Sequence, residues 1–255
     1  MLFDTHAHLV DKVFDEDRKE VIKKSYEKDK VTNIINVGTD LNSSKQCVEL
    51  AERYDFLFSS VGIHPIHTKE AKINDAEKIK ILAQHKKNVA IGEIGLDYHY
   101  KDFDEKQQKK WFEKQLKVAK RLNIPVIVHD RDSNFECINI IESLKIKKGV
   151  FHCFNGDEKI AQKIIEMGFH LSFTGIVTYK NAKNLIQVIR SIPNDKILIE
   201  TDCPYLSPEP HRGKRNYPGN VKHIAEKIAN IKNTTFEEIA DITNKNAKKL
   251  FLNKI

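Results

Sequence analysis

Short runs of apolar and β-branched residues recur along the chain, and charged amphipathic stretches of helical length separate most of them. The clearest amphipathic stretch, residues 105–122, carries Trp111 and Leu116 on one apolar stripe. The apolar runs predict eight β-strands, at residues 1–5, 33–37, 57–61, 88–91, 125–128, 149–151, 170–173 and 196–199.

Strands that alternate with helices form βα units, whose right-handed crossovers require parallel strands. Eight such units close into a TIM (β/α)8 barrel, and no linker or composition break divides the chain. We therefore predict one α/β domain over residues 1–255. Residues 220–230 and 236–251 are predicted as closing helices, the second interrupted near Asn244.

Composition adds limits rather than a function. The 255 residues are 40% hydrophobic, which is enough for a sizeable core, and no apolar run approaches the roughly 20 residues that cross a bilayer. The first strand begins almost at once and leaves no room for a signal peptide, so we expect a soluble, cytoplasmic protein without membrane contact. The net charge of +7 suits a polyanionic partner, but a lysine-rich composition explains it equally well.

The four cysteines form no C-x-x-C pair, and we expect buried thiols rather than disulfides. Cys153 and Cys203 each follow a candidate metal ligand directly. Because side chains alternate along a strand, both thiols are expected to point away from the ligands, towards the helices.

Candidate ligands lie at or just after the C-terminal ends of the predicted strands. His6 and His8 are two residues apart, so a strand directs both imidazoles to one side, where they suit a divalent cation. Further candidates follow the third, fourth, fifth, sixth and eighth strands, at His64, Glu93, His129, His152 and Asp202. That end of a barrel carries the active site, so we predict a metal centre there.

So many nitrogen and oxygen donors imply more than one metal, because a single tetrahedral zinc needs three or four ligands. The two oxygens of Glu93 allow it to bridge two cations, and Asp202 is suited to holding a cation or orienting its water. Two cations stabilise the attacking and departing oxygens of a phosphoryl displacement and lower the pKa of bound water. We expect two divalent cations, with Mg²⁺ or Mn²⁺ favoured and Zn²⁺ as the alternative.

Several blocks of sequence resemble the signatures of the TatD-type deoxyribonucleases, a branch of the metal-dependent amidohydrolase superfamily with a TIM-barrel fold. The resemblance runs in order over nearly the whole chain. The blocks read FDTHAHL (3–9), GIHP (62–65), GEIGLDY (92–98), FHCFNG (151–156), ETDCPYL (200–206) and HRGKRN (211–216).

The resemblance implies a role for each candidate. It implies that Glu93 bridges the metals and that His64 lies beside the scissile phosphate. With Asp202, these two residues form the expected catalytic set. The metal ligands that it implies are His6, His8, Glu93, His129, His152 and Asp202.

A basic loop follows the eighth strand. Arg212 and Lys214, with Arg215, lie where late barrel loops often hold phosphate, so Arg212 and Lys214 join His64 as predicted substrate-binding residues. Asp4 and Glu200 share strand faces with ligands. They are either acceptors for ligand N–H groups or members of a buried structural network.

Three functional hypotheses follow. The first is a metal-dependent deoxyribonuclease that acts as a monomer on DNA, and the resemblance suggests 3′–5′ exonuclease action with single strands preferred. The second is an amidohydrolase for a small ester or amide or an aminoacyl ester, since the same ligands cleave such bonds. A non-catalytic metal-binding module is disfavoured because no expected ligand is missing. The basic loop distinguishes the deoxyribonuclease from the small-molecule amidohydrolase, because a neutral substrate would not need its positive charges.

Overall fold

Eight parallel strands form one sheet in sequence order in the computed structural model, which describes residues 1–100, 102, 104–133 and 135–253. The strands are β1 (Leu2–Ala7), β2 (Val31–Val37), β3 (Leu57–Val61), β4 (Asn88–Asp97), β5 (Val126–Arg131), β6 (Gly149–Phe151), β7 (His170–Phe173) and β8 (Ile197–Ile199). A parallel bridge from Ala7 to Cys203 links β1 to the segment after β8, so the sheet closes into a barrel. The predicted TIM-barrel fold is confirmed.

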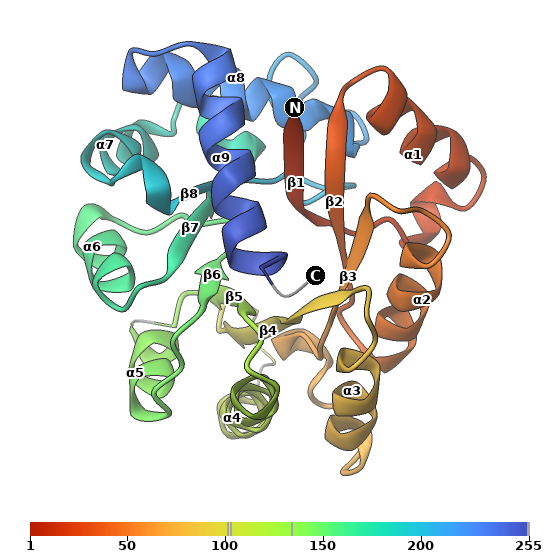
Figure 1. Cartoon of the computed structure of the whole chain (residues 1–255). Helices are drawn as coiled ribbons and strands as arrows, with labels where there is room; N and C mark the ends of the chain where they lie inside the picture. Colours follow the sequence, from red (N-terminus) through yellow and green to blue (C-terminus); the bar gives the residue numbers. More distant parts are fainter. Residues whose placement is uncertain (101, 103, 134, 254–255) are drawn as a thin grey trace.

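Helices follow the strands and surround them (Figure 1). The first four are α1 (Arg18–Glu27), α2 (Leu41–Ala51), α3 (Asp75–Ala83) and α4 (Glu105–Leu122). The others are α5 (Glu136–Ser143), α6 (Glu158–Glu166), α7 (Lys183–Ser191), α8 (Val221–Lys232) and α9 (Phe236–Phe251). Short 3-10 turns lie at Lys12–Phe14, Pro65–His67, Gly175–Thr178, Asn194–Lys196 and Pro218–Asn220. The predicted helix at residues 105–122 coincides with α4.

Three strands continue beyond their predicted C-terminal ends. β1 continues to Ala7, β4 to Asp97 and β5 to Arg131, so His6, Glu93 and His129 lie within strands. The apolar pattern ends early because polar candidate ligands replace apolar residues on the inward face of these strands. The pairing of β1 with β2 is irregular between Asp4 and Ala7, and that of β4 with β5 between Ile91 and Ile94. Such irregularities change the direction of side chains, here those of His6 and Glu93.

The helix α9 closes the end of the barrel where the strands begin. In Figure 1 it crosses in front of the strands, near the N-terminus. Its Ala247 and Phe251 belong to one buried cluster with residues of the strands: Phe3, Ile35, Val37, Phe58, Val89, Ala90, Ile127, Val150 and Leu198. The catalytic end of the barrel is therefore the opposite one.

The expected interruption of the last helix near Asn244 is wrong, because α9 is continuous over Phe236–Phe251. The side chains of Asn244 and Asn246 leave their own helix intact and bond elsewhere. Asn244 Nδ2 donates to the carbonyl of Met1 (3.0 Å), and Asn246 Nδ2 donates to that of Ile197 (2.9 Å). These bonds fasten α9 to the beginnings of β1 and β8.

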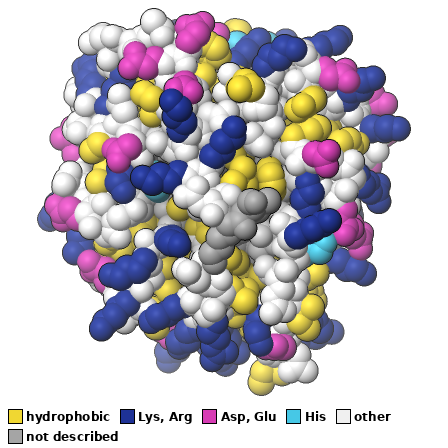
Figure 2. Space-filling model, in the orientation of Figure 1, with side chains coloured by type: hydrophobic (Ala, Val, Ile, Leu, Met, Phe, Trp, Pro, Cys, Tyr) yellow, Lys and Arg dark blue, Asp and Glu magenta, His cyan; other side chains and the backbone are white. Residues whose placement is uncertain are grey.

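Among the described residues, no helix is long and apolar enough to cross a membrane. Lysine and arginine side chains are spread over the α9 face, with aspartate and glutamate between them (Figure 2). Basic side chains thus also lie on a face away from the candidate ligands, so the net charge of +7 does not by itself indicate a polyanionic substrate.

Candidate metal centre

The seam of the barrel brings three candidate ligands together. The His8 N–H donates to the Cys203 carbonyl (2.8 Å), and the Asp202 N–H donates to the His6 carbonyl (2.9 Å). Asp202, three residues after the end of β8, has a φ of 54°, in the left-handed region. Residues nearly 200 positions apart in sequence therefore share one site.

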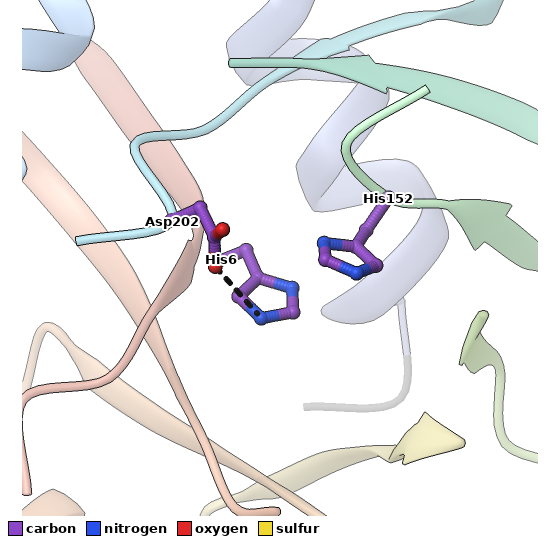
Figure 3. A group of neighbouring side chains, drawn as sticks. All are labelled: His6, His152 and Asp202. Atoms are coloured by element: carbon purple, nitrogen blue, oxygen red, sulfur yellow. Dashed lines mark ion pairs between the residues drawn. The ribbon is translucent and has the colours of Figure 1, made fainter. Parts of the chain in front are cut away.

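A first donor group surrounds one oxygen of Glu93. The Nε2 atoms of His6 and His8 lie 3.1 Å apart. His6 Nε2 is 3.4 Å from Glu93 Oε2 and 3.7 Å from Asp202 Oδ1, and His8 Nε2 is 3.3 Å from Asp202 Oδ1. Figure 3 shows Asp202 and His6 directed towards each other, with the His152 ring beside them. The prediction that a His-x-His pair shares one side is confirmed.

A second donor group surrounds the other oxygen of Glu93. His152 Nε2 lies 2.6 Å and His129 Nδ1 lies 2.8 Å from Glu93 Oε1. These two nitrogens are 3.2 Å apart. All six predicted ligands thus converge, and Glu93 stands between the two groups with one oxygen towards each.

Close packing of β4 on β5 makes this convergence feasible. Gly95 has a φ of 152°, and a side chain there would collide with the carbonyl oxygen of His129. The absence of a Cβ lets the backbone of His129 come close to β4, two residues beyond Glu93.

The outer nitrogens of His8 and His129 meet hydrogen-bond acceptors, and that of His152 faces a carboxylate at ion-pair distance, which directs the inner nitrogens at the site. His8 Nδ1 is 3.0 Å from the Val37 carbonyl, and His129 Nε2 is 3.0 Å from Asp97 Oδ2. His152 Nδ1 is 3.4 Å from Glu200 Oε1. A bound cation would take the place of the protons on the inner nitrogens, while the outer nitrogens keep theirs, which is the form in which imidazole binds a metal.

The arrangement fits divalent cations. The inner nitrogens of His129 and His152 lie 3.2 Å apart, a spacing that is favourable only when a proton or a cation lies between them. Two nitrogens on one tetrahedral zinc, each at roughly 2.0–2.1 Å, lie roughly 3.3 Å apart, so the spacing matches a shared ion. The imidazole and carboxylate donors also suit Mn²⁺ and, less closely, Mg²⁺.

The electrostatics of Glu93 favour its anionic form. Burial acts to raise the pKa of this carboxyl, but the nearby His152 and His64 and hydrogen bonds from His129 and His152 lower it well below its usual range. The pKa of Asp202 is also lowered, because bonding to His8 and the charge of His6 outweigh its burial. Both side chains are therefore charged and ready to hold cations at neutral pH.

His64 lies at the edge of the second group. Its Nε2 is 3.4 Å from Glu93 Oε1, and its Nδ1 accepts the N–H of Ile66 (3.2 Å). Burial lowers the pKa of His64 to about 4, although Glu93 opposes this. The ring is thus neutral, with its proton on Nε2, and acts as a hydrogen-bond donor directed into the site.

Asp4 and Glu200, the two carboxylates that share strand faces with candidate ligands, have different roles. Asp4 accepts the Thr201 N–H (2.8 Å) and the Thr201 hydroxyl (2.6 Å), and burial raises its pKa to about 8. Asp4 therefore belongs to a buried structural network that holds the segment following β8. Glu200 lies beside His152 and accepts the Cys153 N–H (2.6 Å), so it orients a ligand.

Sequence reasoning missed Asp97 and Asn216. Asp97 holds His129, and its signal is its position on β4, four residues after Glu93 and on the same strand face. Asn216 is fully buried and donates from Nδ2 to the carbonyls of Thr201 (2.9 Å) and Tyr205 (2.7 Å). It clamps the loop that carries Asp202, and no local pattern indicates this role.

A pocket of about 1190 Å³ opens over the donor groups, and all the predicted ligands except His6 line it. Cys153 is also a lining residue, and its thiol lies 3.7 Å from the Thr174 hydroxyl. β6 ends at Phe151 and Cys153 has a φ of 45°, so strand alternation no longer applies there. Cys203 is buried as expected.

The basic loop lies beside this pocket rather than in its lining. Within the described part of the chain, neither Arg212 nor Lys214 is among the lining residues. The Arg212 guanidinium lies over the Tyr179 ring, 4.3 Å from its centre. Arg215 donates from Nη1 to Asp17 (2.9 Å) and is committed to an ion pair. Phosphate binding by Arg212 and Lys214 stays a prediction.

A parallel barrel with a histidine- and carboxylate-rich centre at the carboxyl ends of its strands defines the class of metal-dependent hydrolases. The sequence model of the family described as "TatD related DNase" matches residues 3–252. The chain belongs to this family.

Similar proteins agree with this assignment. The chain is 46% identical to the "uncharacterized metal-dependent hydrolase YabD" of Bacillus subtilis (strain 168), over 98% of this chain and 99% of the relative. It is 37% identical to the metal-dependent hydrolase YcfH of Escherichia coli (strain K12), over 98% and 95% of the two chains. The crystal structure of YJJV, a TatD homolog from Escherichia coli K12, superposes with a TM-score of 0.93 at 27% identity and covers 98% of both chains. The chain is therefore a metal-dependent hydrolase.

Proposed function

We propose that this hydrolase cleaves phosphodiester bonds of DNA with two divalent cations. The observation that supports this most strongly is the division of the donors between the two oxygens of Glu93. The membership of a family described as DNases supports DNA as the substrate. We further propose attack from the 3′ end of a single strand, with Mg²⁺ or Mn²⁺ favoured over Zn²⁺.

The cations would be held by His6, His8 and Asp202 on one side of Glu93 and by His129 and His152 on the other. When bound, they supply Lewis-acid stabilisation of a phosphoryl group and lower the pKa of water. The Asp202 side chain is 14% exposed and lines the pocket, so it orients the attacking water and accepts its proton.

His64 Nε2–H is placed to donate to a non-bridging oxygen of the phosphate. Its outer nitrogen is occupied by the Ile66 N–H, which fixes the direction of the ring. All the proposed ligands come from one chain, so we propose that the monomer is the active unit.

A small ester, amide or aminoacyl ester is the second candidate substrate, because the pocket lining is rich in carboxylates. Its basic side chains are Lys12, Arg18, Arg53 and Arg131. Its carboxylates are Asp11, Asp15, Asp40, Glu49, Glu93, Asp97, Asp130 and Asp202, twice the number of basic residues. Two divalent cations would balance the excess negative charge of these carboxylates at the centre only. Away from the cations the remaining carboxylates repel an anion, so the pocket accommodates a short anionic segment more readily than a long one.

The test is incubation of the purified protein with end-labelled single- and double-stranded DNA, with EDTA or with added Mg²⁺, Mn²⁺ or Zn²⁺. We expect metal-dependent shortening from the 3′ end, faster on single strands. Strong metal-dependent turnover of small esters or amides without DNA cleavage would favour the second candidate.

A further inference from the structure

Exposed apolar side chains gather at the mouth of the metal pocket. Three of the large hydrophobic residues that are exposed in the described part of the chain line it: Ile66, Tyr100 and Tyr205, with 46%, 55% and 54% of their surface accessible. They follow β3, β4 and β8, so Tyr100 and Tyr205 come from strands half a barrel apart. Exposed aromatic surface at a binding site is a sign of a ligand that covers it.

Tyr205 is the member of this group nearest the first donor group. Its ring centre lies 6.2 Å from that of His8, with the two planes inclined at 62°. Only a sugar separates a phosphate from its base in a nucleotide. A phosphate held at the donor groups would therefore bring a neighbouring base to the Tyr205 ring.

The position of Tyr205 is fixed before any ligand arrives. Its N–H donates to the Asp202 carbonyl (3.0 Å), and its own carbonyl accepts from the buried Asn216 (2.7 Å). Its hydroxyl donates to Asp11 Oδ2 (3.1 Å). A side chain held at both ends loses little conformational entropy on binding, which makes it an effective stacking surface.

Tyr100 is less suited to this task, because one of its faces is partly occupied. The Arg131 guanidinium lies 5.6 Å from the centre of its ring. The Tyr205 ring has no such cation over it among the interactions of the described residues. Tyr205 is therefore the residue on which the following inference rests.

We infer that the Tyr205 ring stacks on the nucleobase next to the scissile phosphodiester and so positions a nucleotide rather than a bare phosphate ester. This inference rests on the proposed function, DNA hydrolysis. Stacking on an aromatic side chain accepts every base, because each has a π-face, so the inferred substrate class is single-stranded DNA without strong sequence preference. A base paired in a duplex is stacked on its neighbours and is less available.

The test compares two single-stranded oligonucleotides that differ at one nucleotide next to the cleaved bond, which either carries its base or is an abasic sugar. For the wild type we expect KM to be about tenfold higher on the abasic oligonucleotide, the typical scale of one base–aromatic contact. In Tyr205→Leu this ratio should fall to about one, and in Tyr205→Phe, which keeps the ring, it should stay near the wild-type value.

Tyr26→Leu is the matched control. Tyr26 is also exposed (44%) and stacks on Phe56, but it is outside the pocket lining. This variant should keep the wild-type ratio. Metal content, measured for every variant, shows whether the centre remains assembled.

The outcomes separate the inference from the proposed function. A wild-type KM ratio near one, or an undiminished ratio in Tyr205→Leu, would overturn the role of Tyr205 while leaving DNA hydrolysis in place. If both KM values of Tyr205→Leu rise in parallel, the residue acts structurally and the inference is wrong. Failure of the wild type to cleave either oligonucleotide would overturn the proposed function and the inference with it.

Discussion

At the scale of single residues, Glu93 divides the site into two halves. Oε2 faces the histidines of β1, and Oε1 faces those that follow or lie within β5 and β6. A neutral amide would offer one weak oxygen donor and one N–H group that repels a cation. In the proposed function, the carboxylate is therefore the feature that would let two cations share one site.

We predict that Glu93→Gln binds fewer cations and loses at least about a hundredfold in turnover, since even residues that merely support a ligand contribute 10–100-fold. The measurements are metal content by mass spectrometry and DNA cleavage at saturating metal. Glu113→Gln, a change on the exposed face of α4, is the control and should match the wild type. Full metal content with near wild-type turnover in Glu93→Gln would exclude the bridging role.

The convergence of the candidate ligands could be predicted from sequence, while several of the residues that support them could not. His6, His8 and Asp202 follow from a two-residue spacing and from their place at strand ends. Asn216 donates to the carbonyls of Thr201 and Tyr205, which are more than ten residues before it in the sequence. Only the tertiary structure shows that these carbonyls lie beside Asn216. The place of Cys153 in the pocket lining likewise goes with its positive φ, which its residue type does not indicate.

At the scale of elements, α9 closes the barrel end that lies opposite the site. Phe251 is buried (4% exposed) in the cluster inside the barrel. We predict that Phe251→Ala lowers the free energy of unfolding by about 3–5 kcal/mol, the usual cost of a cavity left by phenylalanine. Chemical denaturation measures this. Metal content of the folded variant should be unchanged.

Ile81→Ala on α3 is the control for Phe251→Ala, because Ile81 is 62% exposed and its truncation should cost no more than about 0.5 kcal/mol. If Phe251→Ala costs no more than this control, α9 is a surface addition and does not close the core.

His170, at the start of β7, makes stability depend on pH. Burial, with the charge of Lys196, lowers the pKa of His170 to about 4, whereas an unfolded histidine titrates near 6.5. As the pH falls from 7 to 5, His170 becomes protonated in the unfolded chain but stays neutral in the native state. The free energy of unfolding therefore falls by about 2 kcal/mol between pH 7 and pH 5 on account of His170.

We predict that His170→Gln loses about 2 kcal/mol less stability than the wild type between pH 7 and pH 5. Denaturation curves of both proteins at the two pH values give this difference directly, and any fixed effect of the substitution cancels. Parallel losses in the two proteins would show that native His170 titrates normally.

The elements themselves were largely predictable, and their ends were not. The eight strands and the helix Glu105–Leu122 follow from the apolar periodicity. β4 extends six residues beyond its apolar run, to Asp97. Its backbone continues to pair with β5, while its side chains change from apolar core residues to candidate ligands. In α9, asparagines suggested a break, but their side chains bond to Met1 and Ile197 outside the helix.

At the scale of the whole molecule, barrel closure creates the site. The bonds from His8 to Cys203 and from Asp202 to His6 join the first and last strands, so that ligands from both ends of the chain meet around Glu93. The order of the strands could be predicted because each βα unit adds one parallel neighbour. The sequence could not show that the donors divide into two groups, one at each oxygen of Glu93, because this depends on the side-chain positions in the folded barrel.

The central claim is that two cations, one on each side of Glu93, are needed for hydrolysis. The most direct test starts from protein stripped with EDTA and adds Mn²⁺ stepwise, with bound metal and cleavage of single-stranded DNA measured in the same samples. We predict two bound cations per chain and cleavage that rises mainly with the second. Full cleavage at one bound cation per chain, or cleavage that persists in EDTA, would contradict the account.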